Sequence, residues 1–159
     1  MKRIVLPICI CGLAAAVAAP ASFGFANIFD YVGSVKGQEA TASVGFAISK
    51  SAAGRKRAVD FTVTGVDYSC SDAAPGQTEG WRFERGMRIK ARKFSGEGDW
   101  TGLPLDPVGK VDGRLKPGGI ASGSFKITGE LAGPGTHCKT GFVGWKASTA
   151  PLTRDRAAG

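Results

Sequence analysis

The chain has 159 residues, of which 43% are hydrophobic, and a formal net charge of +8. Its length suits one domain of ordinary size, which can bury a core without a metal or many disulfides. The 24 glycines are spread along the chain without a fixed period. That distribution excludes collagen and a flexible linker, and it is typical of turns and bulges. The positive charge favours solubility and attraction to anionic polymers.

The N-terminus has the three parts of a signal peptide in the expected order. A positive start at residues 1–3 is followed by an apolar run at 4–17 and a small-x-small cleavage site that ends at Ala18. Cleavage after Ala21 or Ala26 is an alternative. The apolar run is shorter than the roughly 18–20 residues that a membrane-spanning helix needs, so a retained anchor is the less favoured interpretation.

Cleavage at the favoured site divides the sequence into four parts. We expect a signal peptide at 1–18, a lead-in at 19–30, a β-domain at 31–148 and a flexible tail at 149–159. Loss of the leader removes two basic residues and lowers the net charge to +6. The expected location is outside the cell or in the periplasm or cell envelope, with no membrane span after cleavage.

The cysteines support export and predict a covalent link. Cys9 and Cys11 lie in the apolar run and would leave with the signal peptide. Cys70 and Cys138 remain. Because exported proteins fold in an oxidising compartment, we expect these two thiols to form a disulfide.

Alternation of apolar and polar residues dominates the chain from about residue 31 onward. In the clearest case, Phe125 and Ile127 face one way while Lys126 and Thr128 face the other, as in an antiparallel sheet with one buried face. The expected strands are 31–36, 41–48, 57–70, 79–84, 87–101 with an interruption, 107–116, 119–131 and 137–148. The predicted fold is therefore an all-β antiparallel meander of about eight strands, as a sandwich or a partly closed barrel, with one disulfide.

The disulfide constrains the topology of this meander. The alternation shifts by one residue at Gly65 and near Gly141, which predicts a bend beside each cysteine. Cys70 ends its strand and Cys138 begins its own, so a bridge between them requires antiparallel strands and an even number of strands between them. If residues 87–101 are counted as one interrupted strand, four strands lie between the two cysteines. We therefore predict no chain reversal at residues 92–93.

The last strand carries a recognisable pattern, C-x-T-G-x-V-x-W-x-A, over residues 138–147. Together with the glycine-punctuated segment 119–125, it resembles an uncharacterised family of secreted bacterial all-β proteins. The resemblance covers nearly the whole expected mature chain and implies secretion, a β-fold and a disulfide. It implies no catalytic residue. One departure is the basic pair Arg92 and Lys93, where such proteins often have a glycine before the phenylalanine.

Few residues suggest catalysis, a metal or a cofactor. His137 is the single histidine and lacks the partners of a catalytic triad or zinc site, so we interpret it as a surface residue. Glu97 and Asp99 share a strand face and are a conceivable carboxylate pair, but nothing marks a cleft around them. Asp106 and Asp112 are further acids that could hold calcium between loops. Solvated surface acids are the favoured interpretation of all four.

Three tryptophans raise the question of ligand stacking. Trp145 alternates with neighbouring apolar residues, and Trp81 shares its strand face with Phe83, so both are expected in the core. Trp100 is flanked by glycines near an expected loop. A half-exposed ring there is a candidate for stacking on a ligand.

A basic cluster is the strongest functional indication. On an extended strand, Arg88, Lys90 and Arg92 would project from one face about 6–7 Å apart and could follow a polyanion. A second basic group, Arg55, Lys56 and Arg57, lies at an expected turn. The alternative is a solvated strand edge, because basic side chains also keep sheet edges soluble. Without interleaved exposed aromatic residues, the cluster does not predict a specific nucleic-acid platform.

These observations favour a non-catalytic exported protein that binds an anionic polymer at the cell envelope. The alternative from another class is a carrier of small apolar ligands, because a closed meander could enclose an apolar pocket. An enzyme is the third choice. The sequence does not specify the ligand or the oligomeric state.

Overall fold

The computed structural model describes residues 26–101, 107–130 and 135–149. The expected signal peptide, Asp106 and nearly all of the expected tail therefore lie outside the described residues. In the described part of the chain, all regular structure is β. The strands are β1 (Ala26–Val35), β2 (Ser43–Lys50), β3 (Lys56–Thr64), β4 (Asp67–Cys70), β5 (Gly76–Gln77), β6 (Trp81–Phe83), β7 (Met87–Arg88), β8 (Lys93–Thr101), β9 (Val108–Lys116), β10 (Ile120–Gly129), β11 (Cys138–Lys139) and β12 (Val143–Thr149).

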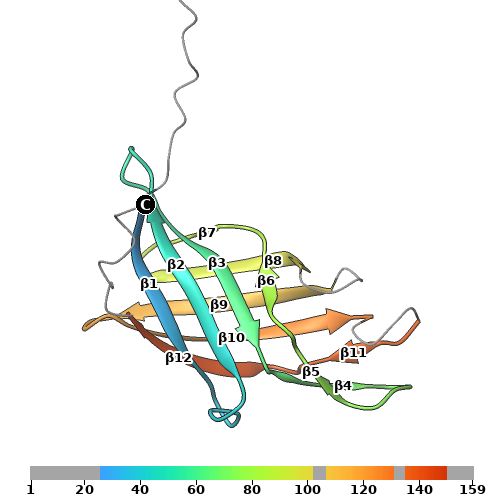
Figure 1. Ribbon diagram of the computed structural model, residues 1–159. Helices are drawn as coiled ribbons and strands as arrows, with labels where there is room; N and C mark the ends of the chain where they lie inside the picture. Colours follow the sequence, from blue (N-terminus) through green and yellow to red (C-terminus); the bar gives the residue numbers. More distant parts are fainter. Residues whose placement is uncertain (1–25, 102–106, 131–134, 150–159) are drawn as a thin grey trace, which may run out of the picture.

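The sheet closes into an antiparallel barrel. Its strand order is β12-β1-β2-β3-β6-β8-β9-β10, and β12 pairs again with β10 to complete the ring of eight. Figure 1 shows β1, β2 and β3 crossing in front of β8, β9 and β10, so the barrel wall forms two facing layers. The expected all-β antiparallel fold is confirmed, in its barrel form. The first strand starts at Ala26, inside the segment expected as a lead-in.

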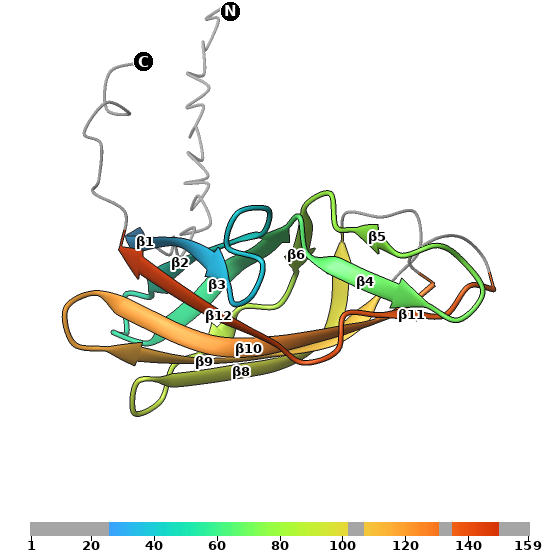
Figure 2. The same ribbon diagram turned by 90° about the horizontal axis from the view of Figure 1, so that it is seen from below.

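Three short strands form an arm outside this ring. β11 pairs with β10 and β4, and β4 pairs with β5; in Figure 2 the three extend beyond one end of the barrel. Cys70 on β4 lies directly opposite Cys138 on β11, and the two form the expected disulfide, with 4.0 Å between their Cα atoms. Gly65 and Gly141 adopt φ of +71° and +69° and interrupt the two cysteine strands where bends were expected.

The prediction of no reversal at residues 92–93 is wrong. Lys90 and Lys93 exchange backbone hydrogen bonds of 2.9 and 2.8 Å, which closes a two-residue hairpin around Ala91 and Arg92. Both turn residues have positive φ, 46° and 62°, as a type I′ turn requires. The turn forms without the asparagine and glycine that usually occupy it, which is why its sequence gave no turn signal.

The even number of strands between the cysteines is nevertheless preserved. β6 and β7 are both antiparallel to β3, so they form one interrupted pass along the same neighbour. The interruption therefore lies at residues 84–86, and the reversal follows at the next turn. The expected number of four strands is right when β6 and β7 are counted as one. The prediction placed the chain reversal before residue 87, whereas it lies at Ala91 and Arg92.

Aromatic rings fill the barrel interior. Phe46 is at the centre of this core and stacks on Tyr31 at 4.7 Å between ring centroids. It also contacts Phe61, Phe94 and Trp145, with 5.5–5.8 Å between ring centroids. These inward rings come from five different strands, so one aromatic cluster holds both layers of the wall together.

The core includes all three tryptophans. Trp81 and Trp145 are 0% and 3% exposed, which confirms their expected burial. Trp100, considered above as a candidate for stacking on a ligand, has a ring that is 1% exposed and packs against Phe61 and Phe83. A ring in this position presents no face to a ligand at the surface.

Inward glycines make room for these rings. Gly113 on β9 lies directly opposite Phe94 on β8, and a Cβ atom on this glycine would overlap the Phe94 ring. Gly123 on β10 is placed in the same way opposite Trp145 on β12. Each ring thus covers the bare backbone of its cross-strand neighbour, an arrangement that stabilises glycines in sheets.

Candidate anion-binding surface

Strand pairing brings together the two basic groups that are separate in the sequence. β3 pairs with β7, which places Arg57 directly opposite Arg88. The Ile89 N–H donates to the carbonyl of Lys56 at 3.0 Å and continues this pairing. The turn after β2 and the hairpin after β7 therefore lie side by side at one end of the barrel, with the β9–β10 turn as their neighbour.

We call this surface the basic end. It is formed by three segments, 50–57, 88–93 and 114–116, and none of them contains an aspartate or glutamate. Its ten cations are Lys50, Arg55, Lys56, Arg57, Arg88, Lys90, Arg92, Lys93, Arg114 and Lys116. All ten are exposed. The surface is therefore strongly positive at the end of the barrel opposite the disulfide arm.

Several of these cations lie directly opposite one another on neighbouring strands. Such pairs are Lys50 with Lys56, Arg57 with Arg88, and Lys93 with Arg114. Like charges in directly opposed positions destabilise a sheet. In the absence of a ligand these pairs destabilise the folded state, and a bound anion would reduce the repulsion.

Three ion pairs on the described surface leave four cations of the basic end unpaired. Among the described residues they join Arg82 to Asp60, Arg85 to Asp99 and Lys110 to Asp112, at 3.9–4.0 Å. Arg88, Lys90, Lys93 and Arg114 take part in none of them. These four cations are therefore available to a ligand without first breaking an ion pair.

A groove of about 650 Å³ runs over the outer face of β8, β9 and β10 beside the hairpin. We call it the serine groove. Its polar lining residues are Arg88, Lys90, Lys93, Ser95, Asp112, Arg114, Ser122 and Ser124. The backbones of Gly113 and Gly123 contribute to its floor, with Phe94 beneath. Four cations, one carboxylate and three hydroxyls thus line a single concave surface.

A second, smaller groove of about 350 Å³ lies on the other side of Arg88, which we call the hairpin groove. Arg55, Lys56 and Arg92 line it together with Arg88, and Leu115 contributes apolar surface. The predicted straight row of three cations is therefore wrong in its geometry. Because the chain reverses at Ala91 and Arg92, Lys90 lines the serine groove and Arg92 lines the hairpin groove, while Arg88 lies between the two grooves and lines both.

The residues that sequence reasoning missed are Arg114 and the three serines, and Lys93 was noted only as part of the basic pair before Phe94. The sequence feature that could have identified them is the alternation along β9 and β10, where Arg114 and Ser122 lie on the outer face between more buried neighbours. That parity shows which face they occupy. It does not show that Lys93 and Ser122 flank Arg114 on either side, because this depends on strand register.

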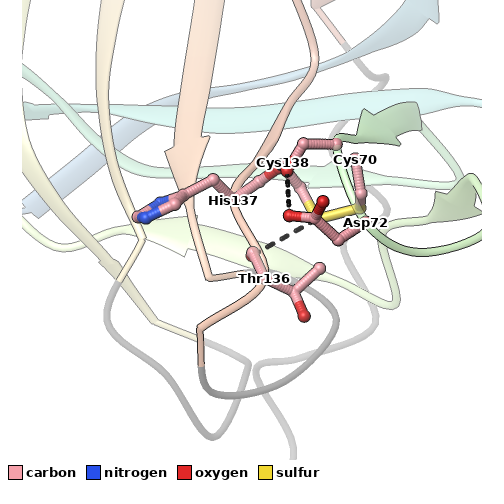
Figure 3. Close-up of a disulfide and its surroundings, with 6 residues drawn as sticks. Cys70, Asp72, Thr136, His137 and Cys138 are labelled. Carbon is pink, nitrogen blue, oxygen red and sulfur yellow. Dashed lines mark hydrogen bonds between the residues drawn. A yellow bond between two sulfur atoms is a disulfide. The ribbon is translucent and has the colours of Figure 1, made fainter.

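The other candidate residues stay apart from this surface. His137 is exposed, and its imidazole points away from the disulfide and Asp72 (Figure 3). Its carbonyl accepts a hydrogen bond of 3.1 Å from the backbone N–H of Ser71. Glu97 lies opposite Lys110, and Asp99 pairs with Arg85, so these two acids serve as partners of basic residues. In the described ranges, no three His, Cys, Asp or Glu residues form a group that could hold a metal ion.

Two groups outside the basic end have perturbed acidity. Burial raises the pKa of Tyr31, whose ring stacks inside the barrel. The N–H of Gly37 donates to Glu39 Oε1 at 2.9 Å and lowers the pKa of that carboxyl group. Both effects belong to the core and the β1–β2 turn, and neither acts on a residue of the two grooves.

No family model matches the chain, and neither a curated protein nor a solved structure shows significant similarity to it. Among the described residues, no helix has the length and apolar character that crossing a membrane would require. The resemblance of residues 138–147 to secreted bacterial β-proteins remains a prediction.

Proposed function

We propose that this is an exported, non-catalytic protein that binds an anionic polymer of the cell envelope at its basic end. The observation that carries the proposal is the convergence of three segments, distant in sequence, on one end of the barrel. Together they contribute ten cations and no carboxylate. The disulfide and the signal-like N-terminus support export.

The physical basis of binding is electrostatic. A highly charged polymer carries condensed counterions, and cations that replace them release these ions to solution, which favours association. The two grooves extend the positive surface on both sides of Arg88, so a chain with repeated anionic groups can contact both at once. A single small anion would contact one of them.

The alternative function, a carrier of small apolar ligands, is supported by a different observation. Among the described residues, the buried indole N–H groups of Trp81, Trp100 and Trp145 have no hydrogen-bond partner. A ligand with an acceptor group could satisfy them inside the barrel. The interior is filled by aromatic side chains, however, and such a ligand would have to displace them. We therefore prefer anion binding.

Retention on a sulfated resin tests the preferred function. The wild-type protein should be retained at moderate ionic strength and elute as salt rises. The triple variant Arg88→Glu/Lys90→Glu/Lys93→Glu should pass through, because it reverses three charges of the serine groove. The matched control is Lys36→Glu/Arg85→Glu/Lys139→Glu, which makes the same charge change outside the basic end and should remain bound.

Two results would count against this function. Equal losses in both triple variants would mean that net charge alone sets retention, and flow-through of the wild type would mean that there is no such site. An apolar compound recovered by solvent extraction of the purified protein, and identified by mass spectrometry, would favour the carrier instead.

A further inference from the structure

The serine groove holds chemical groups that a simple polyanion does not need. Beside its four cations it presents one carboxylate, Asp112, and three hydroxyls. A carboxylate repels the phosphates or sulfates of a bare polyanion. Hydroxyls and a carboxylate together are, however, suitable partners for the hydroxyl groups of a sugar or polyol.

The register of the sheet orders these groups into two rows. In one row Ser95, Asp112 and Ser124 lie directly opposite one another on β8, β9 and β10. In the next row Lys93, Arg114 and Ser122 do the same. The rows lie two residues apart along each strand, which is roughly 6.5–7 Å, and neighbouring strands are about 4.8 Å apart. The groove therefore places a hydroxyl-binding row one sugar unit away from a cationic row.

The hydroxyl-binding row is available to a ligand. The two serine hydroxyls of this row, on Ser95 and Ser124, make no hydrogen bond within the described part of the chain. The carboxylate of Asp112 has one charged partner, Lys110 at 4.0 Å, and its side chain is 46% exposed. Each of these oxygens can therefore exchange water for a ligand hydroxyl without losing a protein hydrogen bond.

The aromatic content of the groove separates sugars from nucleic acid. Phe94, the aromatic side chain that lines the groove, is 3% exposed and packs inward against Phe46 and Trp145. Binding of single-stranded nucleic acid usually relies on exposed rings on which bases stack. The groove has polar hydrogen-bonding groups where such a platform would have its rings.

From these features we infer that the ligand of the basic end is an anionic glycan, with sugar or polyol units that carry both free hydroxyls and phosphate or sulfate groups. The inference rests on the proposed function and specifies its ligand. Hydroxyls of one unit donate to Asp112 and exchange hydrogen bonds with Ser95 and Ser124. The anionic group of that unit or the next binds Lys93 and Arg114.

Asp112→Asn distinguishes this specificity from plain charge attraction. Two probes are used: heparin, whose sulfates alternate with free sugar hydroxyls, and inorganic polyphosphate, which has no hydroxyls along its chain. The variant should bind heparin about fivefold more weakly, the effect of weakening one hydrogen bond to a charged acceptor. It should bind polyphosphate more tightly than the wild type, because a negative charge has left the groove.

A matched control and a charge-neutral variant complete the experiment. Asp99→Asn makes the same charge change outside the groove and should not weaken binding to either polymer. Ser95→Ala/Ser124→Ala changes no charge and should weaken heparin binding while leaving polyphosphate binding unchanged. Thermal unfolding of each variant checks that its fold is retained.

The outcomes separate the inference from the proposed function. If Asp112→Asn strengthens binding to both polymers, or the serine variant binds heparin as the wild type does, the glycan specificity is wrong and anion binding stands. If the wild type binds a single-stranded oligonucleotide more tightly than heparin at the same salt concentration, the ligand class is wrong. If the wild type binds none of the polymers, the proposed function itself fails.

Discussion

Lys93 on β8 lies directly opposite Arg114 on β9, and among the described residues neither cation takes part in an ion pair. A sheet selected for stability alone would place an acid opposite one of them, as it does where Glu97 faces Lys110. In the proposed function, these opposed cations bind the anionic polymer.

Lys93→Glu should have opposite effects on stability and on binding. The free energy of unfolding should rise by about 0.5 kcal/mol, because an attractive cross-strand pair replaces a repulsive one. Affinity for an anionic polymer should fall. Urea denaturation and a binding titration on the same sample measure both. Lys139→Glu, at the other end of the barrel, is the control; if it weakens binding as much as Lys93→Glu, the position of the charge does not matter.

Gly113→Ala tests the packing of rings over inward glycines. The added methyl group would overlap the Phe94 ring, so the free energy of unfolding should fall by about 2 kcal/mol, as in other overpacked cores. Gly45→Ala is the matched control, because the nearest atom to its Cβ is the Tyr31 carbonyl oxygen at 3.7 Å, an ordinary contact. Equal losses in the two variants would show that Phe94 does not lie on Gly113.

Arg92→Gly tests the hairpin between β7 and β8. Arg92 has a φ of 62°, which costs about 1–2 kcal/mol for a residue with a side chain and little for glycine. Glycine also has a larger conformational entropy in the unfolded chain, which offsets part of this relief. We therefore expect the free energy of unfolding to rise by roughly 0.5–1 kcal/mol. Ala53→Gly, at a turn position without positive φ, should be destabilising. A loss of stability in Arg92→Gly would mean that the chain does not reverse there.

Replacing Cys70 and Cys138 by serine should lower the free energy of unfolding by roughly 4 kcal/mol. The bridge spans a sequence separation of 68, and closing a loop of this size restricts the unfolded chain by about that amount. Chemical denaturation of the oxidised protein and the double variant gives the difference. Peptide mapping without reductant should find the two cysteines linked, and free thiols in folded protein would contradict the pairing.

The alternation of apolar and polar residues predicted much of the fold, because each strand of the barrel has one buried face and one solvent-exposed face. Alternation located most strands to within a few residues, and the two cysteines that remain after loss of the leader predicted the disulfide. Trp100 could also have been assigned correctly, since it shares its parity on β8 with the buried Phe94. Its flanking glycines suggested a loop, whereas inward glycines in this barrel accommodate neighbouring rings.

The hairpin and the candidate site depend on information that local pattern does not contain. The turn at Ala91 and Arg92 lacks the usual turn residues, and the disulfide parity allowed two divisions of the chain into four passes. The meeting of Arg57 with Arg88 depends on β7 returning to β3, and the rows of the serine groove depend on register. These are long-range choices that the packing of the whole barrel decides.

The most direct test of the account is a salt titration of polymer binding. The dissociation constant of the wild-type protein for heparin is measured at several salt concentrations, beside Arg88→Glu/Lys90→Glu/Lys93→Glu. Saturable binding is expected, with a slope of log affinity against log salt of about −3 to −4, which corresponds to the four cations of the serine groove, by analogy with nucleic acids. In the triple variant the slope should become less negative by about three and the affinity should nearly vanish. Identical slopes and affinities in the two proteins, or no saturable binding by the wild type, would contradict the assignment of the basic end as the binding site.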